Sequence, residues 1–100
     1  MRPSQDSIRE RVFYIDLTGV TDRDALQERL CAALPMPAHY GRNLNALYDV
    51  LTENGAGWNL ILYRSLALEH AQPKLFATLT RLLDEAAGET PGMRVRWFRG

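Results

Sequence analysis

The chain has 100 residues, and its twelve basic and twelve acidic side chains give a formal net charge of zero. This balance excludes a strongly basic protein that binds nucleic acid by neutralising phosphates, and no apolar run is long enough to cross a membrane. We therefore expect neither a nucleic-acid partner nor a membrane partner. Hydrophobic residues make up 46%, which is typical of a globular domain and not of a disordered chain.

We expect one domain over residues 1–100, with a loose polar segment at residues 1–11, because no repeat or linker divides the sequence. Cys31 is the only cysteine, so an internal disulfide is excluded and a cytoplasmic location is favoured for so small a domain. Between Val12 and Met93 there are ten acidic and six basic residues. This acidic central part favours a basic partner.

The first strand is predicted at residues 12–17 (VFYIDL), which are rich in β-branched and aromatic side chains, and Gly19 ends it. Thr21 is the expected N-cap of the next helix, with carboxylates in the first turn that suit the helix dipole. Leucines and alanines recur at helical spacing up to Pro35, where we expect this helix to stop.

A second helix is predicted from an Asn43 cap through about Thr52, after a proline-stiffened loop. Residues 54–57 (NGAG) indicate a turn, and residues 58–63 (WNLILY) predict the second strand.

The last part of the chain predicts two helices and a strand. Residues 65–71 favour a short helix, and Pro73 suits the first position of a longer one that Gly88 is expected to end. Residues 93–98 (MRVRWF) predict the third strand.

Strands that alternate with helices predict an α/β fold with parallel strands joined by crossover connections. Alternate strand residues would form one apolar face and one mixed face. Because fully sandwiched parallel strands are apolar on both faces, we expect a two-layer domain with helices on one side of a three-stranded sheet. The mixed face would contain Tyr14, Asp16, Asn59, Tyr63, Arg94 and Arg96.

A search for catalytic chemistry finds little support. The chain has two histidines, His39 and His70, and none of the spacings that hold a metal ion or cradle a nucleotide phosphate. We expect no metal, no cofactor and no enzymatic activity. A small enzyme that uses His39 with Asp49 or Glu85 remains a third hypothesis, and it requires a pocket that joins these groups.

The second helix has two distinct sides. A projection at about 100° per residue places Leu44, Leu47, Val50 and Leu51 on one side, facing the sheet. Asn45, Asp49 and Thr52 fall on the opposite side, Tyr48 lies at its margin, and His39 and Tyr40 lie in the preceding loop. Aromatic and polar side chains combined in this way are typical of a protein interface, although they also fit a solvated helix beside the core.

The order of residues in this segment resembles the barstar-like family of intracellular ribonuclease inhibitors. The family pattern has a proline, a tyrosine–glycine pair, Asn-Leu-Asp-Ala-Leu, an aromatic residue and an aspartate. This chain has Pro37, Tyr40-Gly41 and the run Asn43-Leu44-Asn45-Ala46-Leu47-Tyr48-Asp49 in the same register. The resemblance implies a parallel sheet in strand order 1-2-3 with about four helices.

The resemblance also implies roles for individual residues. Asp49 would take the place of an RNA phosphate in a basic nuclease cleft, with Tyr48 as its aromatic neighbour and His39 packed over the nuclease active site. Gly41 and Asn43 would shape the entry to the helix. Glu85 would be a peripheral carboxylate that faces a basic group, or else a helical partner of Arg81. The implied partner-binding set is His39, Tyr40, Gly41, Asn43, Asn45, Tyr48, Asp49, Thr52 and Glu85.

The chain departs from the family pattern at several of these positions. Asn45 replaces an aspartate, Arg42 replaces an acidic residue, and His39 and Tyr48 replace tyrosine and tryptophan. The function implied is that of a monomeric inhibitor of a microbial extracellular ribonuclease. The alternative is a binding module of the same fold with a partner that is not a nuclease, which Asn45 and Arg42 favour because they dilute the acidic surface.

Overall fold

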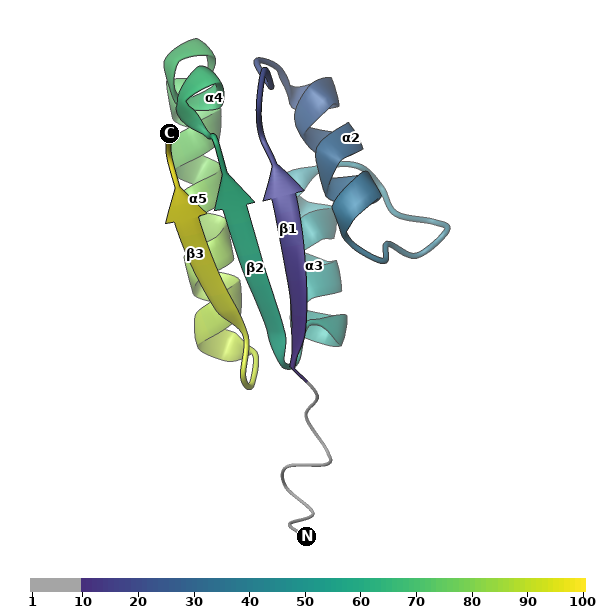
Figure 1. Ribbon diagram of the computed structural model, residues 1–100. Coiled ribbons are helices and arrows are strands. Elements are labelled where there is room, and N and C mark those ends of the chain that lie inside the picture. Colours follow the sequence, from purple (N-terminus) through teal and green to yellow (C-terminus); the bar gives the residue numbers. More distant parts are fainter. Residues whose placement is uncertain (1–9) are drawn as a thin grey trace, which may run out of the picture.

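The computed structural model describes residues 10–100, so most of the segment expected to be loose, residues 1–11, lies outside the described residues. Within these residues, a three-stranded parallel sheet in the order β1-β2-β3 is combined with four helices (Figure 1). This arrangement confirms the predicted α/β fold and strand order. In chain order the elements are β1 (Arg11–Asp16), α2 (Arg23–Ala33), α3 (Leu44–Asn54), β2 (Trp58–Tyr63), α4 (Leu66–Ala71), α5 (Pro73–Glu89) and β3 (Arg94–Phe98).

The sheet has one covered face and one open face. Figure 1 shows α3 and α5 behind the strands, α2 beside β1 and α4 at the far end of β2, and none of the described helices crosses in front of the strands. Ile15 pairs with Leu62, and Leu62 pairs with Trp97, so alternate residues of all three strands point into the same core. Tyr14, whose side chain points away from the helices, is 64% exposed. The predicted two-layer architecture is therefore confirmed.

The start of α2 differs from the prediction. Asp22, and not Thr21, is the N-cap: its backbone is extended (φ −148°), and its Oδ1 accepts a hydrogen bond of 2.8 Å from the N–H of Ala25. Both residue types cap helices well, so the sequence preference alone does not choose between them.

The end of α5 also differs from the prediction. Gly88 lies inside the helix, which continues through Glu89. The helix stops at Thr90, which has extended backbone (φ −116°) and precedes Pro91. A proline disfavours helical backbone in the residue before it, so Pro91 and not Gly88 accounts for the stop.

The packing of α3 against α5 positions the outward surface of these two helices, which contains the candidate site. The buried side of α3 consists of Leu47, Val50 and Leu51, and these side chains join the same core as the inner face of the sheet. The buried side of α5 is formed by Leu75, Leu79, Leu83 and Ala86. The two helices contact each other along the helical layer, so their outward sides form one continuous surface.

Gly88, inside α5, and Gly55, the C-cap residue of α3, should respond oppositely to substitution by alanine. A Cβ on Gly88 would meet nothing within 4 Å, so Gly88→Ala should raise the free energy of unfolding by about 0.5 kcal/mol through lower backbone entropy of the unfolded chain. A Cβ on Gly55 would lie 2.4 Å from the carbonyl oxygen of Leu51, so Gly55→Ala should lower it by roughly 1–3 kcal/mol. Urea unfolding of both variants measures this, and a destabilising Gly88→Ala would contradict the helix end described above.

Candidate functional site

The entry to α3 is built by Asn43 and the residues before it. Oδ1 of Asn43 accepts a hydrogen bond of 2.7 Å from the N–H of Ala46, which confirms the predicted cap. Nδ2 of Asn43 donates to the carbonyl of Gly41 at 3.3 Å, and a Cβ on Gly41 would lie only 3.3 Å from that nitrogen. Arg42 between them has φ of +55°, in the left-handed region that costs energy for a residue with a Cβ. The loop is therefore held in one specific conformation.

Tyr40 anchors this loop to α2. Its ring is half-buried against the core, and its hydroxyl donates a hydrogen bond of 2.7 Å to Oε1 of Gln27, a buried side chain of α2. Burial raises the pKa of Tyr40 above its ordinary value. The hydroxyl of Tyr40 thus already has a partner within the chain, and the residue supports the loop.

The outward side of α3 has the exposure that the helical projection predicts. Asn45 and Asp49 are exposed, whereas Leu47 is completely buried. Thr52 is half-buried, and its hydroxyl donates to the carbonyl of Tyr48 at 2.9 Å. Among the described residues, nothing donates a hydrogen bond to the carboxylate of Asp49 or forms an ion pair with it. This carboxylate is therefore available to an outside partner.

Asp49 stands between two hollows of the surface. The α3–α5 groove, of about 380 Å³, is lined by Asp49 and by Asn45, Tyr48, Thr78, Arg81, Leu82 and Glu85. The loop hollow, of about 430 Å³, lies on the other side of Asp49 and is lined by it and by Pro37, His39, Tyr40, Gly41, Ala46, Val50, Glu53 and Asn54. Asp49 is the residue common to both. The structure thus brings most of the predicted set around one carboxylate.

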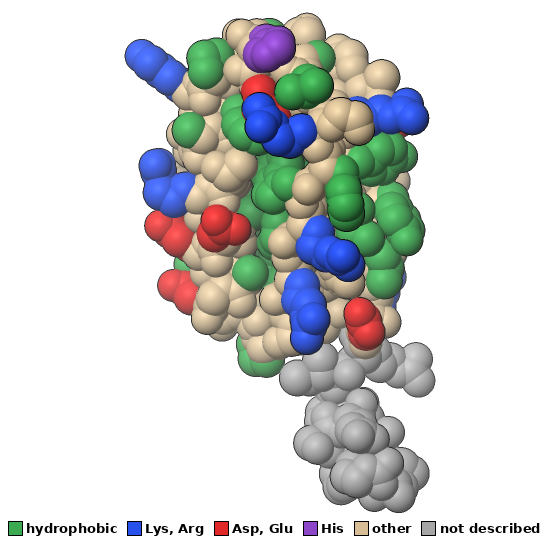
Figure 2. All heavy atoms as spheres, turned by 60° about the vertical axis from the view of Figure 1, so that its left-hand side comes forward, with side chains coloured by type: hydrophobic (Ala, Val, Ile, Leu, Met, Phe, Trp, Pro, Cys, Tyr) green, Lys and Arg blue, Asp and Glu red, His purple; other side chains and the backbone are tan. Residues whose placement is uncertain are grey.

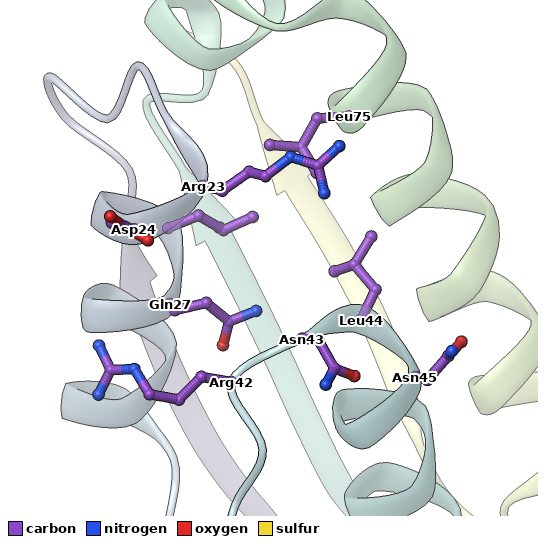
Figure 3. A pocket seen from close by; sticks show the side chains of 9 residues that line it. Arg23, Asp24, Gln27, Arg42, Asn43, Leu44, Asn45 and Leu75 are labelled. Carbon is purple, nitrogen blue, oxygen red and sulfur yellow. The ribbon is translucent and has the colours of Figure 1, made fainter.

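A third hollow, of about 370 Å³, joins the start of α3 to α2 and α5. Figure 3 shows Gln27 pointing from α2 toward the start of α3, while the side chain of Asn45 points toward α5. Arg42 extends the opposite way, alongside α2. The positive charge of Arg42 is therefore directed away from the α3–α5 groove.

The position of Tyr48 is fixed by a residue that the sequence analysis did not find. The hydroxyl of Tyr48, on α3, donates a short hydrogen bond to a carboxylate oxygen of Glu89, on α5. This bond to Glu89 raises the pKa of Tyr48 to about 12, with smaller contributions from burial and neighbouring carboxylates. The two residues are 41 positions apart in the chain, so no local pattern could have linked them.

Glu85 does not form the helical pair considered as one of its two roles. Among residues 10–100, the ion pair present joins Arg99 to Glu69 at 2.8 Å, so Arg81 and Glu85 are not paired. Both side chains instead line the α3–α5 groove.

The sequence model of one family, described as Barstar (barnase inhibitor), matches residues 10–98. The chain belongs to the Barstar family. No curated protein matches it.

The description of the Barstar family names an inhibitor and no catalytic activity. The enzyme hypothesis requires a hollow that joins His39 to Asp49 or to Glu85. His39 and Asp49 line the same hollow, whereas Glu85 lines the other one, which does not include His39. In the part of the chain that the structure describes, no cluster of three potential metal ligands occurs. Within that same part, every helix is too short or too polar to span a bilayer.

The N-cap role of Asn43 can be tested by measuring the free energy of unfolding of variants at this position. Asn43→Ala removes the acceptor for the N–H of Ala46 and should lower the free energy of unfolding by about 1 kcal/mol. Asn43→Ser is the control, because serine also caps helices and should restore most of the loss. Urea unfolding gives both values, and equal stability of the alanine variant and the parent chain would rule the cap out.

The Tyr48–Glu89 bond can be tested by alkaline titration. The pKa of Tyr48 in the folded chain, about 12, lies above the ordinary 10.0, so the bond contributes fully to stability below pH 10 and is lost as the pH rises toward 12. Glu89→Gln should return the Tyr48 transition, followed by phenolate absorbance, toward pH 10. Tyr48→Phe identifies the transition by removing it. A Tyr48 transition that stays near 12 in Glu89→Gln argues against the bond.

Proposed function

We propose that this chain inhibits a ribonuclease by laying α3 and the preceding loop into its basic active-site cleft. The observation that carries the proposal is the exposed carboxylate of Asp49, which stands between two hollows and has no charged partner among the described residues. The match to the Barstar family, whose description names barnase inhibition, supports the same function.

The mechanism follows from the charge of a ribonuclease cleft. Such a cleft is positive because it binds RNA phosphates, and its arginine and histidine side chains can donate to a carboxylate as they do to a phosphate. Charge-assisted hydrogen bonds between arginine and a carboxylate are short and can be bidentate. In this proposal Asp49 takes the position of the phosphate, and α3 itself blocks access of RNA to the catalytic groups.

The neighbours of Asp49 would supply shape and rigidity. Tyr48 is already held by Glu89, so little side-chain entropy would be lost when its ring meets the nuclease. His39 lies on the opposite side of Asp49, in the wall of the loop hollow, where its ring could cover the active site. Asn45 and Glu85 would contact the rim through the α3–α5 groove. Tyr40, Gly41, Asn43 and Thr52 hold this surface in shape more than they offer free polar groups.

Local charge would assist the encounter even though the chain as a whole is neutral. Four exposed acidic residues of α3 and α5 line the two hollows or bind Tyr48 there, namely Asp49, Glu53, Glu85 and Glu89. Opposite potentials speed association, and salt screens them over about 10 Å at 0.1 M. From the resemblance to the barstar-like family, we also propose that the inhibitor is intracellular and protects its own cell from the nuclease.

A second candidate function is a binding module whose partner is not a nuclease. Arg81 lines the α3–α5 groove together with Asp49, and Asn45 contributes no charge there. This groove therefore suits a partner surface that presents an acidic group next to its basic ones.

The test uses the chain against a panel of purified basic microbial ribonucleases, at equimolar amounts. The parent chain should abolish RNA cleavage by at least one of them. Asp49→Ala should weaken inhibition of that enzyme about 30-fold or more, equivalent to roughly 2 kcal/mol of lost binding free energy. Asp84→Ala is the matched control, because Asp84 is also an exposed aspartate of the helical layer but lies outside both hollows.

Two results would count against the proposal. Equal inhibition by Asp49→Ala and the parent chain would remove Asp49 from the contact. Failure to inhibit any ribonuclease, together with capture of an unrelated cytosolic protein that Asp49→Ala no longer captures, would favour the binding module.

A further inference from the structure

The open face of the sheet concentrates the exposed apolar surface of the described chain. Four large hydrophobic side chains are exposed in residues 10–100, and three of them, Val12, Tyr14 and Phe98, lie on this face. Half-buried Ile61 and Tyr63 lie between them on β2. Apolar side chains grouped in this way on a monomer commonly mark an interaction surface.

Charge is divided across this face by strand. Asp16 of β1 and Glu10, which precedes that strand, are acidic, and Asn59, bonded to Glu10 at 3.5 Å, places the Glu10 carboxylate on the same side. Arg94 and Arg96 of β3 are basic. The outward residues of β2 are uncharged. Figure 2 shows basic side chains next to a group of hydrophobic ones on this side of the molecule.

We propose that this face binds a second copy of the chain, about a twofold axis parallel to the strands. Such an axis places β1 of one copy opposite β3 of its partner, so the acidic strand of each faces the basic strand of the other. A twofold axis across the strands would instead place arginines on arginines and carboxylates on carboxylates. Charge complementarity therefore selects the first arrangement.

The register makes the facing residues specific. Tyr14, Ile61 and Arg96 form one row across the sheet. The proposed axis passes near Ile61, packs it on its counterpart, and sets Tyr14 of each copy opposite Arg96 of the other. The guanidinium of Arg96 already lies 5.9 Å from the ring centroid of Phe98, two residues along the same strand, and in the proposed dimer it contacts a second aromatic ring as well.

A second copy fits this face better than single-stranded nucleic acid does. Aromatic rings and arginines alone would suit stacked bases and phosphates. Glu10 and Asp16 share the face, however, and their carboxylates would repel a phosphate backbone. A three-stranded face is small, so we expect a weak, reversible dimer that leaves α3, in the opposite layer, accessible on both copies. This proposal differs from the expectation of a monomer, and the experiment below decides between them.

Sedimentation equilibrium of the full chain, from micromolar to millimolar concentration, tests the proposal. The parent chain should associate into dimers, and R94E/R96E should weaken association at least about tenfold, because two acidic strands would then meet. The matched control is R23E/K74E, which makes the same change in net charge on exposed residues of α2 and α5. This control should dimerise like the parent chain.

A charge exchange makes the test independent of any folding defect. E10K/D16N turns the acidic strand basic, so this variant should also fail to associate with itself. Mixed with R94E/R96E, it should form a heterodimer, since each basic strand then faces an acidic one. A parent chain that stays monomeric at every concentration, a dimer that survives R94E/R96E, or a mixture that remains monomeric would each overturn the proposal. Loss of dimerisation should leave ribonuclease inhibition unchanged, so the two proposals fail separately.

Discussion

Burial of the leucine side of α3 is the constraint on which the candidate site depends. Leu47, Val50 and Leu51 are enclosed by the core, so α3 cannot rotate about its axis without exposing them to water. Each such side chain contributes roughly 1.5–3 kcal/mol when it is fully buried. Asp49 therefore points outward because of what its neighbours bury, and its exposure requires no stabilising contact of its own.

The two-layer architecture gives the molecule two surfaces with different chemistry. The helical layer carries acidic side chains around Asp49, whereas the open face of the sheet carries arginines, carboxylates and exposed aromatic rings. A third layer would have covered the strands and made both of their faces apolar. Because it is absent from the described chain, one small domain can offer two separate contact surfaces.

Much of the fold could be predicted from the sequence because the decisive signals are local. Alternation in the strands gave their positions to within one residue, and Asn43 was recognisable as a cap from its residue type and place. Thr21 and Gly88 were misassigned for local reasons as well: Asp22 competes with Thr21 for the cap, and a glycine can lie inside a helix at modest cost. The bond between Tyr48 and Glu89 could not be predicted, because it depends on how α3 packs against α5. The same holds for the hydroxyl of Tyr40, whose acceptor is on α2.

The Tyr48–Glu89 bond also has a consequence for the order in which the molecule matures. The residues around Asp49 come from α3 and the loop before it, but the carboxylate that holds Tyr48 is at the end of α5, 41 positions further along the chain. During synthesis, α3 leaves the ribosome well before α5, and until α5 has docked the ring of Tyr48 has no fixed acceptor and the α3–α5 groove has only one wall. The surface around Asp49 is thus completed only after α5 has been made and has docked on α3.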